Sequence, residues 1–406
     1  FLKKISNKKN YKKKIIVLNK ERFWSDLTAL DKSSELLFLY FDKKKLSLIT
    51  EPFLRTIRKK MTSTFWVDYK DKSFFTEYLN EHSKFIFYFL KFLNIFIKFD
   101  SIITPSIHYL QDRAFEKSIG MLNKNLIILH KENTMDMAYL DKAVELMNKL
   151  LIKFEPTSLI VVYNDMAKKI LVSTKKISSE KVFVLGCPRI DNLIRLNNTN
   201  PDKITLCSFK YNFGNLFVNR DASHPLETNN PKLKLYFNNV HLTFIDLASK
   251  FKEKEFIIKI KYDDMLWKKL IGDLKLQKEK SIGHKIDNLK IISTEYNMTE
   301  LLKMSRLVIG INSLSLVEAR TLGIPCLVPN FKEVSDYKAG LYFKEFLGSE
   351  LIEVNNENEL SIKIKNYLES DFKEEYSEYN KKFIETYFGY SDKKSASRYI
   401  DFLLEN

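Results

Sequence analysis

The sequence predicts an α/β protein with two Rossmann-like, doubly wound domains that face a cleft. Three observations support this fold class. The chain has 406 residues, more than one hydrophobic core usually organises. Continuous apolar runs of strand length alternate with helix-length segments, which is typical of parallel strands covered on both faces. The rhythm also breaks once at a polar segment and then starts again.

The first half contains the first series of apolar runs, and helix-length segments such as 109–122 and 137–153 separate them. These runs do not alternate between apolar and polar residues, so each is expected to be a buried parallel strand. The predicted strands are Ile15–Asn19, Glu35–Phe41, Ser101–Pro105, Asn125–His130, Ser158–Tyr163 and Lys181–Gly186.

The linker is expected at Arg195–Asp202, which is polar, rich in Asn and contains Pro201. We therefore predict an N-terminal domain over 1–197, a second domain over 198–375, and C-terminal helices over 376–406 that pack back on the first domain. Helices are expected at Asn297–Met304 and Leu314–Leu322. The strands predicted after the linker are Ile204–Phe209, Glu255–Lys261, Leu289–Ser293, Arg306–Ile311 and Pro325–Pro329.

The composition is strongly basic, with a formal net charge of +16. Such a surface attracts nucleic acid, anionic lipid or phosphorylated substrates, although a compositional bias toward Lys, Ile, Asn and Phe explains the charge equally well. The three cysteines, Cys187, Cys207 and Cys326, lie far apart. Their spacing fits neither a disulfide framework nor a CxxC pair, so buried thiols are expected.

The most apolar stretch, Phe85–Phe99, contains two lysines and is too short to span a bilayer. A buried helix is one interpretation, and an interfacial helix is the other. The lysines of Lys3–Lys14 add attraction to an anionic membrane face, or they belong to a solvated terminus. The expected location is therefore cytoplasmic, with peripheral attachment to the inner membrane face as an alternative.

The strongest motif covers Val308–Asn330, VIGINSLSLVEARTLGIPCLVPN. A strand ends near Gly310, a polar turn with Asn312, Ser313 and Ser315 follows, and Glu318 lies one turn into the next helix. A helix N-terminus offers unpaired N–H groups and a positive dipole end, which suit a diphosphate. The structural alternative is that the serines cap the helix and Glu318 interacts with its dipole.

Three segments carry a resemblance to known enzymes. The stretch 288–331, with its ELL, Ser-rich turn and EA…LG-P pattern, resembles the donor-binding region of GT-B glycosyltransferases of bacterial surface polysaccharide synthesis. Val182–Ile194 is similar to a G-x-PR-x-D segment of CDP-glycerol glycerophosphotransferases. Glu255–Asp264 stands where many relatives have K-x-H, but the histidine is absent here. The resemblance covers 101–345 in order.

The resemblance implies a nucleotide-activated sugar as donor. Glu318 would contact the ribose, and Ser208, Ser313 and Ser315, with Asn312 in the same turn, would lie at the phosphates. Lys259 and Lys261 would neutralise the diphosphate, and strand alternation would place both on one face. Arg189 either reaches the same charge or pairs with Asp191, and the pairing is the preferred interpretation.

The acceptor side is expected in the N-terminal domain, where LHKEN follows a strand. Glu132 is the predicted general base and His130 the second candidate. The glycerophosphotransferases have His-Gly at this turn, and its absence weakens a polyol-phosphate function; alternatively, Glu132 pairs with Lys131 on the surface. Candidates to hold an acceptor sugar, or simply to begin a helix, are Tyr109, Asp112 and Arg113.

Other chemistries lack support in the sequence. It contains no D-x-D, Walker or GxGxxG motif, no histidine–cysteine spacing for a metal, and no nucleic-acid-binding module. We therefore predict a glycosyltransferase that needs neither metal nor cofactor and acts on a glycan or lipid-linked acceptor. The alternatives are a CDP-polyol phosphotransferase and a non-catalytic GT-B-like binding subunit.

Overall fold

The chain forms two compact units in the computed structural model. Unit 1 comprises Phe1–Asn192 and Glu385–Asn406, and unit 2 comprises Leu193–Ile384. The residues described here are 2–41, 48–53, 55, 73–105, 107, 112–131, 140–150, 158–193, 201–209, 231–261, 264–335, 343–369 and 378–406.

Unit 1 contains a seven-stranded sheet in the order β1-β3-β2-β4-β5-β6-β7. All neighbouring strands are parallel except β1, which runs antiparallel to β3 at the edge. Each predicted apolar run of this half overlaps one strand. The bounds are β1 Leu2–Lys4, β2 Lys13–Val17, β3 Leu36–Phe41, β4 Ser101–Thr104, β5 Asn125–Leu129, β6 Leu159–Val162 and β7 Val182–Val184.

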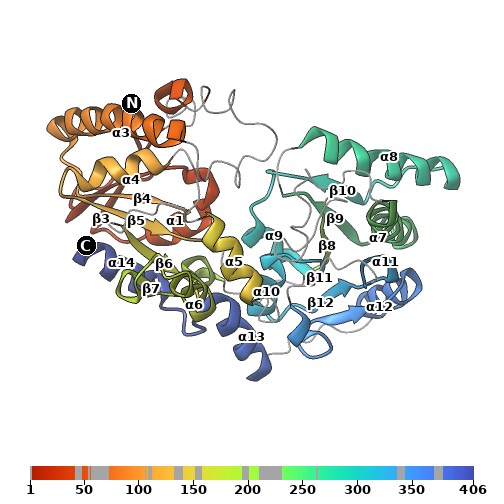
Figure 1. Ribbon diagram of the computed structural model, residues 1–406. Coiled ribbons are helices and arrows are strands. Elements are labelled where there is room, and N and C mark those ends of the chain that lie inside the picture. The colour runs from red at the N-terminus through yellow and green to blue at the C-terminus, as the bar shows by residue number, and fades with distance from the viewer. Residues whose placement is uncertain are drawn as a thin grey trace. The chain divides into compact units, whose positions relative to one another are not determined.

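Helices cover both faces of this sheet (Figure 1). Helix α4 packs on β5 and α3 packs on α4 on one side, whereas α1 and α14 lie on the other. The helices of unit 1 are α1 Trp24–Leu30, α3 Ser73–Ile97, α4 Arg113–Gly120, α5 Leu140–Leu150, α6 Asp165–Ser173 and α14 Ser395–Glu405, with the short 3-10 helices η1 Lys20–Arg22, η4 Ser179–Lys181 and η5 Pro188–Asn192.

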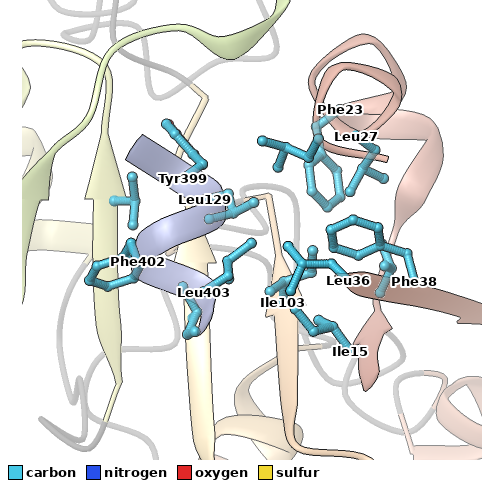
Figure 2. Packing of buried hydrophobic residues seen from close by; sticks show 14 residues of the cluster. Ile15, Phe23, Leu27, Leu36, Phe38, Ile103, Leu129, Tyr399, Phe402 and Leu403 are labelled. Atoms are coloured by element: carbon cyan, nitrogen blue, oxygen red, sulfur yellow. The ribbon is translucent and has the colours of Figure 1, made fainter. Parts of the chain in front are cut away.

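The core of unit 1 joins the two ends of its chain. Alternate strand residues such as Ile15 and Leu129 meet Tyr399, Phe402 and Leu403 of α14 in one buried cluster (Figure 2). The intervening strand residues are buried on the opposite face, which explains why the strand sequences do not alternate. The last helix is therefore an integral part of the first domain's core.

A tight contact fixes the chain where it approaches α14. Gly389 has a φ of 83°, a conformation that side chains disfavour, and a Cβ there would lie 1.8 Å from the carbonyl oxygen of Tyr163. Next to it, the Asn164 amide donates to the carbonyl of Tyr387 at 2.8 Å. Only glycine fits this position.

Unit 2 contains a six-stranded, fully parallel sheet in the order β10-β9-β8-β11-β12-β13. Each predicted run of this half again overlaps one strand, and β13 was not predicted. The bounds are β8 Lys203–Cys207, β9 Glu255–Lys259, β10 Leu289–Ile292, β11 Ser305–Gly310, β12 Cys326–Pro329 and β13 Ile352–Val354.

The helix ends of unit 2 follow capping rules. Asp264 accepts the N–H of Trp267 at the start of α8, and Asn297 accepts that of Glu300 at the start of α9. Gly283, at φ 76°, ends α8. The helices are α7 Pro231–Lys250, α8 Met265–Ile282, α9 Met298–Met304, α10 Leu314–Thr321, α11 Lys332–Ser335, η6 Lys344–Phe346, α12 Glu357–Glu369 and α13 Glu378–Phe388, which contains the boundary between the units.

The three cysteines are buried and form no disulfide, as the sequence predicted. No helix in the described part of the chain is long and apolar enough to cross a membrane.

Candidate functional site

The order in which strands are added to the sheet of unit 2 reverses between β8 and β11. From β8 the chain adds β9 and β10 on one side, then returns to add β11, β12 and β13 on the other. Ligands of open α/β sheets bind at such a switch point, beyond the carboxyl ends of the strands. Ser208 follows β8, and Asn312 and Ser313 follow β11, so these predicted residues lie at the switch point.

The turn from β11 to α10 is built for a tight reversal. Asn312 adopts the left-handed conformation at φ 49°, and Ser313 is the N-cap residue of α10. The Ser313 hydroxyl accepts the N–H of Ser315 at 3.3 Å. The helix begins at Leu314, the first residue of the predicted range Leu314–Leu322. Ser313 therefore has the capping role that the sequence analysis held as its structural alternative.

Three predicted donor residues gather around the thiol of Cys207, the last residue of β8. Burial raises the pKa of Cys207 to about 12; Glu318 raises it further, whereas Lys259 and a hydrogen bond with Ser315 oppose the shift. Glu318 itself is buried. Residues from β9 and α10 thus reach one point at the carboxyl end of β8. We call Lys259, Ser315 and Glu318 the donor cluster.

The Lys259 ammonium lies at the ends of two strands. It donates to the carbonyl of Ile260 at 3.1 Å and to that of Ser293, which follows β10. Burial lowers the pKa of Lys259, and the nearby Cys207 and Glu295 oppose this change. Lys261 lies beyond the end of β9 and its side chain is exposed. The alternation expected to place both lysines on one face therefore does not extend to Lys261.

Ser208 belongs to a polar chain that the sequence did not reveal. His241 of α7 is fully buried, and its Nδ1 lies 2.7 Å from the carbonyl oxygen of Phe237. A carbonyl only accepts, so Nδ1 carries the hydrogen and Nε2 accepts from the Ser208 hydroxyl at 2.8 Å. Trp267 Nε1 donates to the same hydroxyl at 3.0 Å.

These hydrogen bonds determine whether the Ser208 hydroxyl can donate to a phosphate. Burial lowers the pKa of His241 to about 4, so the imidazole is neutral at pH 7. The Ser208 hydroxyl directs its hydrogen to His241, and a phosphate oxygen needs a donor. In this geometry His241 and Trp267 hold the Ser208 hydroxyl, and Ser208 follows Cys207 directly in the chain. No sequence spacing announces this role, because His241 lies 33 residues away from Ser208.

Unit 1 has its own switch point, between β2 and β4, and a buried carboxyl lies there. Asp112, just before α4, accepts two hydrogen bonds from the Asn19 amide, at 2.8 and 3.0 Å, and one from the Thr104 hydroxyl. Asn19 follows β2 and Thr104 ends β4. Burial raises the pKa of Asp112 to about 7, although the hydrogen bonds and Arg113 oppose the shift.

This carboxyl therefore changes protonation state near neutral pH, which a general acid or base requires. The sequence analysis placed Asp112 among the acceptor contacts or at the start of a helix, and preferred Glu132 and His130 as the base. Its neighbour Arg113 begins α4, as the alternative prediction held, and pairs with Glu116 at 3.0 Å. Tyr109 lies outside the described residues.

His130 follows β5 and is buried, and its backbone N–H donates to the carbonyl of Val161 at 2.8 Å. It thus occupies the predicted position at the carboxyl edge of the sheet. Glu132, the predicted general base, lies outside the described residues, so its role stays a prediction.

The predicted pairing of Arg189 with Asp191 was wrong. Its guanidinium donates to the carboxylate of Asp26 at 3.1 and 3.3 Å and to the Tyr163 hydroxyl at 2.8 Å. Asp191 instead accepts the N–H of Ala396 at 2.6 Å. The reason is the fold: Asp26 on α1 and Tyr163 after β6 are brought to Arg189 from far along the chain.

Among the described residues, no group of three or more His, Cys, Asp or Glu side chains has an arrangement that suits a metal ion.

Comparison with known proteins gives similarity of structure alone. No protein-family model matches the chain, and no curated protein matches its sequence. The UDP-GlcNAc 2-epimerase of Methanocaldococcus jannaschii superposes with a TM-score of 0.55 at 15% identity, covering 97% of this chain and 99% of the other. A putative UDP-N-acetylglucosamine 2-epimerase from Listeria monocytogenes gives 0.54 at 13% identity, covering 97% and 96%.

A third solved structure, UDP-GlcNAc 2-epimerase from Neisseria meningitidis bound to UDP-GlcNAc, gives a TM-score of 0.50 at 15% identity, covering 97% of this chain and 99% of the other. These similarities extend over both units. They show that the chain has a GT-B-like fold of two α/β units with Rossmann-like parallel sheets, as the sequence predicted.

Proposed function

We propose that this chain is a glycosyltransferase that takes a sugar from a nucleotide-activated donor. The observation that carries the proposal is the donor cluster, in which an ammonium, a hydroxyl and a buried carboxylate gather at the switch point of unit 2. The predicted acceptor is a glycan or lipid-linked molecule of surface polysaccharide synthesis.

Each member of the donor cluster has a chemical counterpart in a nucleoside diphosphate. Lys259 neutralises phosphate charge, and the half-buried setting strengthens that attraction relative to water. Ser315 lies in the first turn of α10, where N–H groups and the helix dipole favour an anion. Glu318 is a hydrogen-bond acceptor suited to paired ribose hydroxyls. Stabilising the departing diphosphate is the main task of such a site.

Unit 1 supplies the proton acceptor in this proposal. Asp112 is held by the Asn19 amide and the Thr104 hydroxyl, so its orientation is fixed before a substrate binds. Its pKa of about 7 suits the removal of a proton from an acceptor hydroxyl at neutral pH. Glu132 remains the competing candidate from the sequence.

A second candidate function is 2-epimerisation of a UDP-linked amino sugar. The three similar structures are UDP-GlcNAc 2-epimerases, or a putative one, by name, and one of them holds UDP-GlcNAc. Inversion at C2 also needs a nucleotide site and a proton acceptor, and it needs no acceptor molecule. The two candidates therefore differ in what else must be present for turnover.

The test begins with nucleotide binding. We expect one of UDP, CDP, GDP or CMP to raise the melting temperature of the full chain, since a ligand at 100 times its dissociation constant adds about 2.7 kcal/mol to stability. The matching nucleotide sugar is then incubated with and without acceptor in heavy water. Nucleotide release that requires the acceptor supports the transferase.

Other outcomes contradict that function. Deuterium at C2 without any acceptor identifies the epimerase. Transfer of a polyol phosphate from a CDP-linked donor identifies the phosphotransferase, and nucleotide binding without turnover of any of these donors identifies a binding subunit. If none of the four nucleotides shifts the melting temperature, the donor cluster is not a nucleotide site.

A further inference from the structure

Helix α3 exposes a row of large apolar side chains. Phe85, Tyr88, Phe92, Ile95 and Phe96 are between 44% and 70% exposed. Their spacing of three, four, three and one residues places them on one side of an α-helix. The rings of Phe92 and Phe96 contact each other, with centroids 4.9 Å apart. We call these five residues the α3 apolar face.

The opposite side of α3 is already used for packing. Ile86, Leu90 and Leu93 are buried there. The Ser118 hydroxyl of α4 donates to the carbonyl of Ser83 at 2.7 Å, which fixes how α3 lies on α4. The α3 apolar face therefore points away from the core of unit 1, and α3 lies outermost on this side of the sheet (Figure 1).

Such a row exceeds the scattered apolar residues of ordinary surfaces and marks an interaction site. Aromatic side chains suit the boundary between lipid headgroups and acyl chains, because their rings are apolar while their edges or hydroxyls tolerate water. The exposed Tyr88 has this amphipathic character.

The charges beside the row identify the partner. Lys84, Lys91 and Lys98 are exposed along and after the helix, and Glu81 is the exposed acid one turn before Phe85. The Lys14 ammonium donates to the carbonyl of Ile97, so the basic N-terminal segment lies beside the end of α3. An anionic partner matches this surface.

We propose that the α3 apolar face binds the headgroup region of an anionic lipid bilayer, with the aromatic side chains at the acyl boundary and the lysines at lipid phosphates. A second copy of this chain fits less well, because pairing two such faces brings the same lysines toward each other. The proposal goes beyond the proposed function and does not depend on it.

Flotation of the full chain with phosphatidylglycerol-containing vesicles tests the proposal. At low salt the wild type should float with these vesicles and not with pure phosphatidylcholine vesicles. The double variant Phe92→Ser with Phe96→Ser should lower the partition coefficient by at least about tenfold, since two aromatic side chains lose their apolar contact. Lys84→Gln and Lys91→Gln should each lower it by about fivefold at low salt.

The matched control is Leu276→Ser with Ile362→Ser, two residues of unit 2 that are each 49% exposed. This control should float like the wild type, and circular dichroism should show all variants folded. The proposal is overturned if the wild type stays with the soluble fraction at low salt, if neutral vesicles bind it equally, or if the control loses flotation as well. A dimer that only Phe92→Ser with Phe96→Ser dissociates, without vesicle binding, would assign the face to a second copy instead.

Discussion

The turns at the two switch points share one backbone conformation but differ in the charges around them. Asn19 after β2 and Asn312 after β11 both adopt the left-handed conformation, at φ 52° and 49°. In unit 1 the asparagine amide donates to the buried carboxyl of Asp112. In unit 2 the asparagine leads into the N-cap Ser313, and the Lys259 ammonium lies at the end of β9, two strands away from β11 in the sheet.

This difference suits the two α/β units to two different tasks, proton transfer and anion binding. Neutral donors around Asp112 hold a carboxyl without removing its raised pKa, so the group can exchange a proton near pH 7. The helix start and Lys259 in unit 2 instead offer positive potential to an anion. We infer that proton transfer belongs to unit 1 and anion binding to unit 2, and each prediction below addresses one side of this comparison.

The largest effect is expected from Asp112→Asn. The substitution keeps the shape but removes basicity, so turnover should fall by at least about a hundredfold. Nucleotide affinity should stay near wild type, because the donor cluster lies in the other unit. Steady-state kinetics and nucleotide titration measure both quantities.

Two variants make this result interpretable. Glu116→Gln changes another buried carboxyl, one that pairs with Arg113 on the same helix, and should keep turnover within a few-fold of wild type. Glu132→Gln tests the base predicted from the sequence. A hundredfold loss in Glu132→Gln together with an active Asp112→Asn would return the proton-acceptor role to Glu132.

Glu318→Ala addresses unit 2 and should weaken nucleotide binding by roughly 1–3 kcal/mol, because hydrogen bonds to a charged acceptor are lost. Glu300→Ala, an exposed glutamate on α9, is the matched control and should leave affinity unchanged. Isothermal titration with the nucleotide found in the melting screen gives both values. Equal affinities for the two variants would remove Glu318 from the site.

The fold was predictable wherever strands are buried on both faces, because a continuous apolar run is a local signal. The strands β1 and β13 escaped prediction because their sequences, Leu-Lys-Lys and Ile-Glu-Val, contain charged residues and form no continuous apolar run, unlike the equally short β7, Val-Phe-Val. Within the donor cluster, Ser315 and Glu318 share a short motif, so their proximity was also local. The partners of Asp112 and Arg189 could not be predicted from a local signal. Asn19 is 93 residues from Asp112, and Asp26 is 163 residues from Arg189.

The pH dependence of stability should differ in sign for two buried groups, Asp112 of unit 1 and His241 of unit 2. Asp112 has a pKa of about 7 in the folded protein and an ordinary value of 3.8, so between these values the folded state holds a proton that the unfolded chain has lost. Its contribution therefore falls as pH rises through this window. For His241, about 4 when folded and 6.5 ordinarily, the unfolded chain binds the extra proton, and stability rises with pH.

Each group should change the slope of unfolding free energy by up to about 1.4 kcal/mol per pH unit. Asp112→Asn should make stability rise more steeply than in wild type between pH 4 and 7. His241→Gln should make it rise less steeply between pH 4 and 6.5. Chemical denaturation across this range measures the slopes, and unchanged slopes would show that these groups titrate alike when folded and unfolded.

The smallest effect is expected from replacing the two predicted diphosphate lysines. Lys259 is half-buried, whereas Lys261 is exposed. Lys261→Met should weaken a nucleoside diphosphate by at most about 1 kcal/mol and leave the bare nucleoside unaffected, because the side chain is exposed. Lys259→Met should also lower the melting temperature, since its ammonium bonds carbonyls after β9 and β10. Equal losses for nucleoside and diphosphate in Lys261→Met would exclude a direct charge contact.

The position of α14 has a consequence for how the protein is made. Tyr399, Phe402 and Leu403 belong to the same core as β2 and β3, yet the whole of unit 2 is translated between them. At about 5–20 residues per second, the ribosome completes unit 2 and reaches α14 roughly ten to forty seconds after the last strand of unit 1 has emerged. During that interval α1 is already present on this side of the sheet, but the part of the core that Tyr399, Phe402 and Leu403 complete is open. The nascent first domain therefore completes its core only when α14 has been made, whereas unit 2 is continuous in sequence.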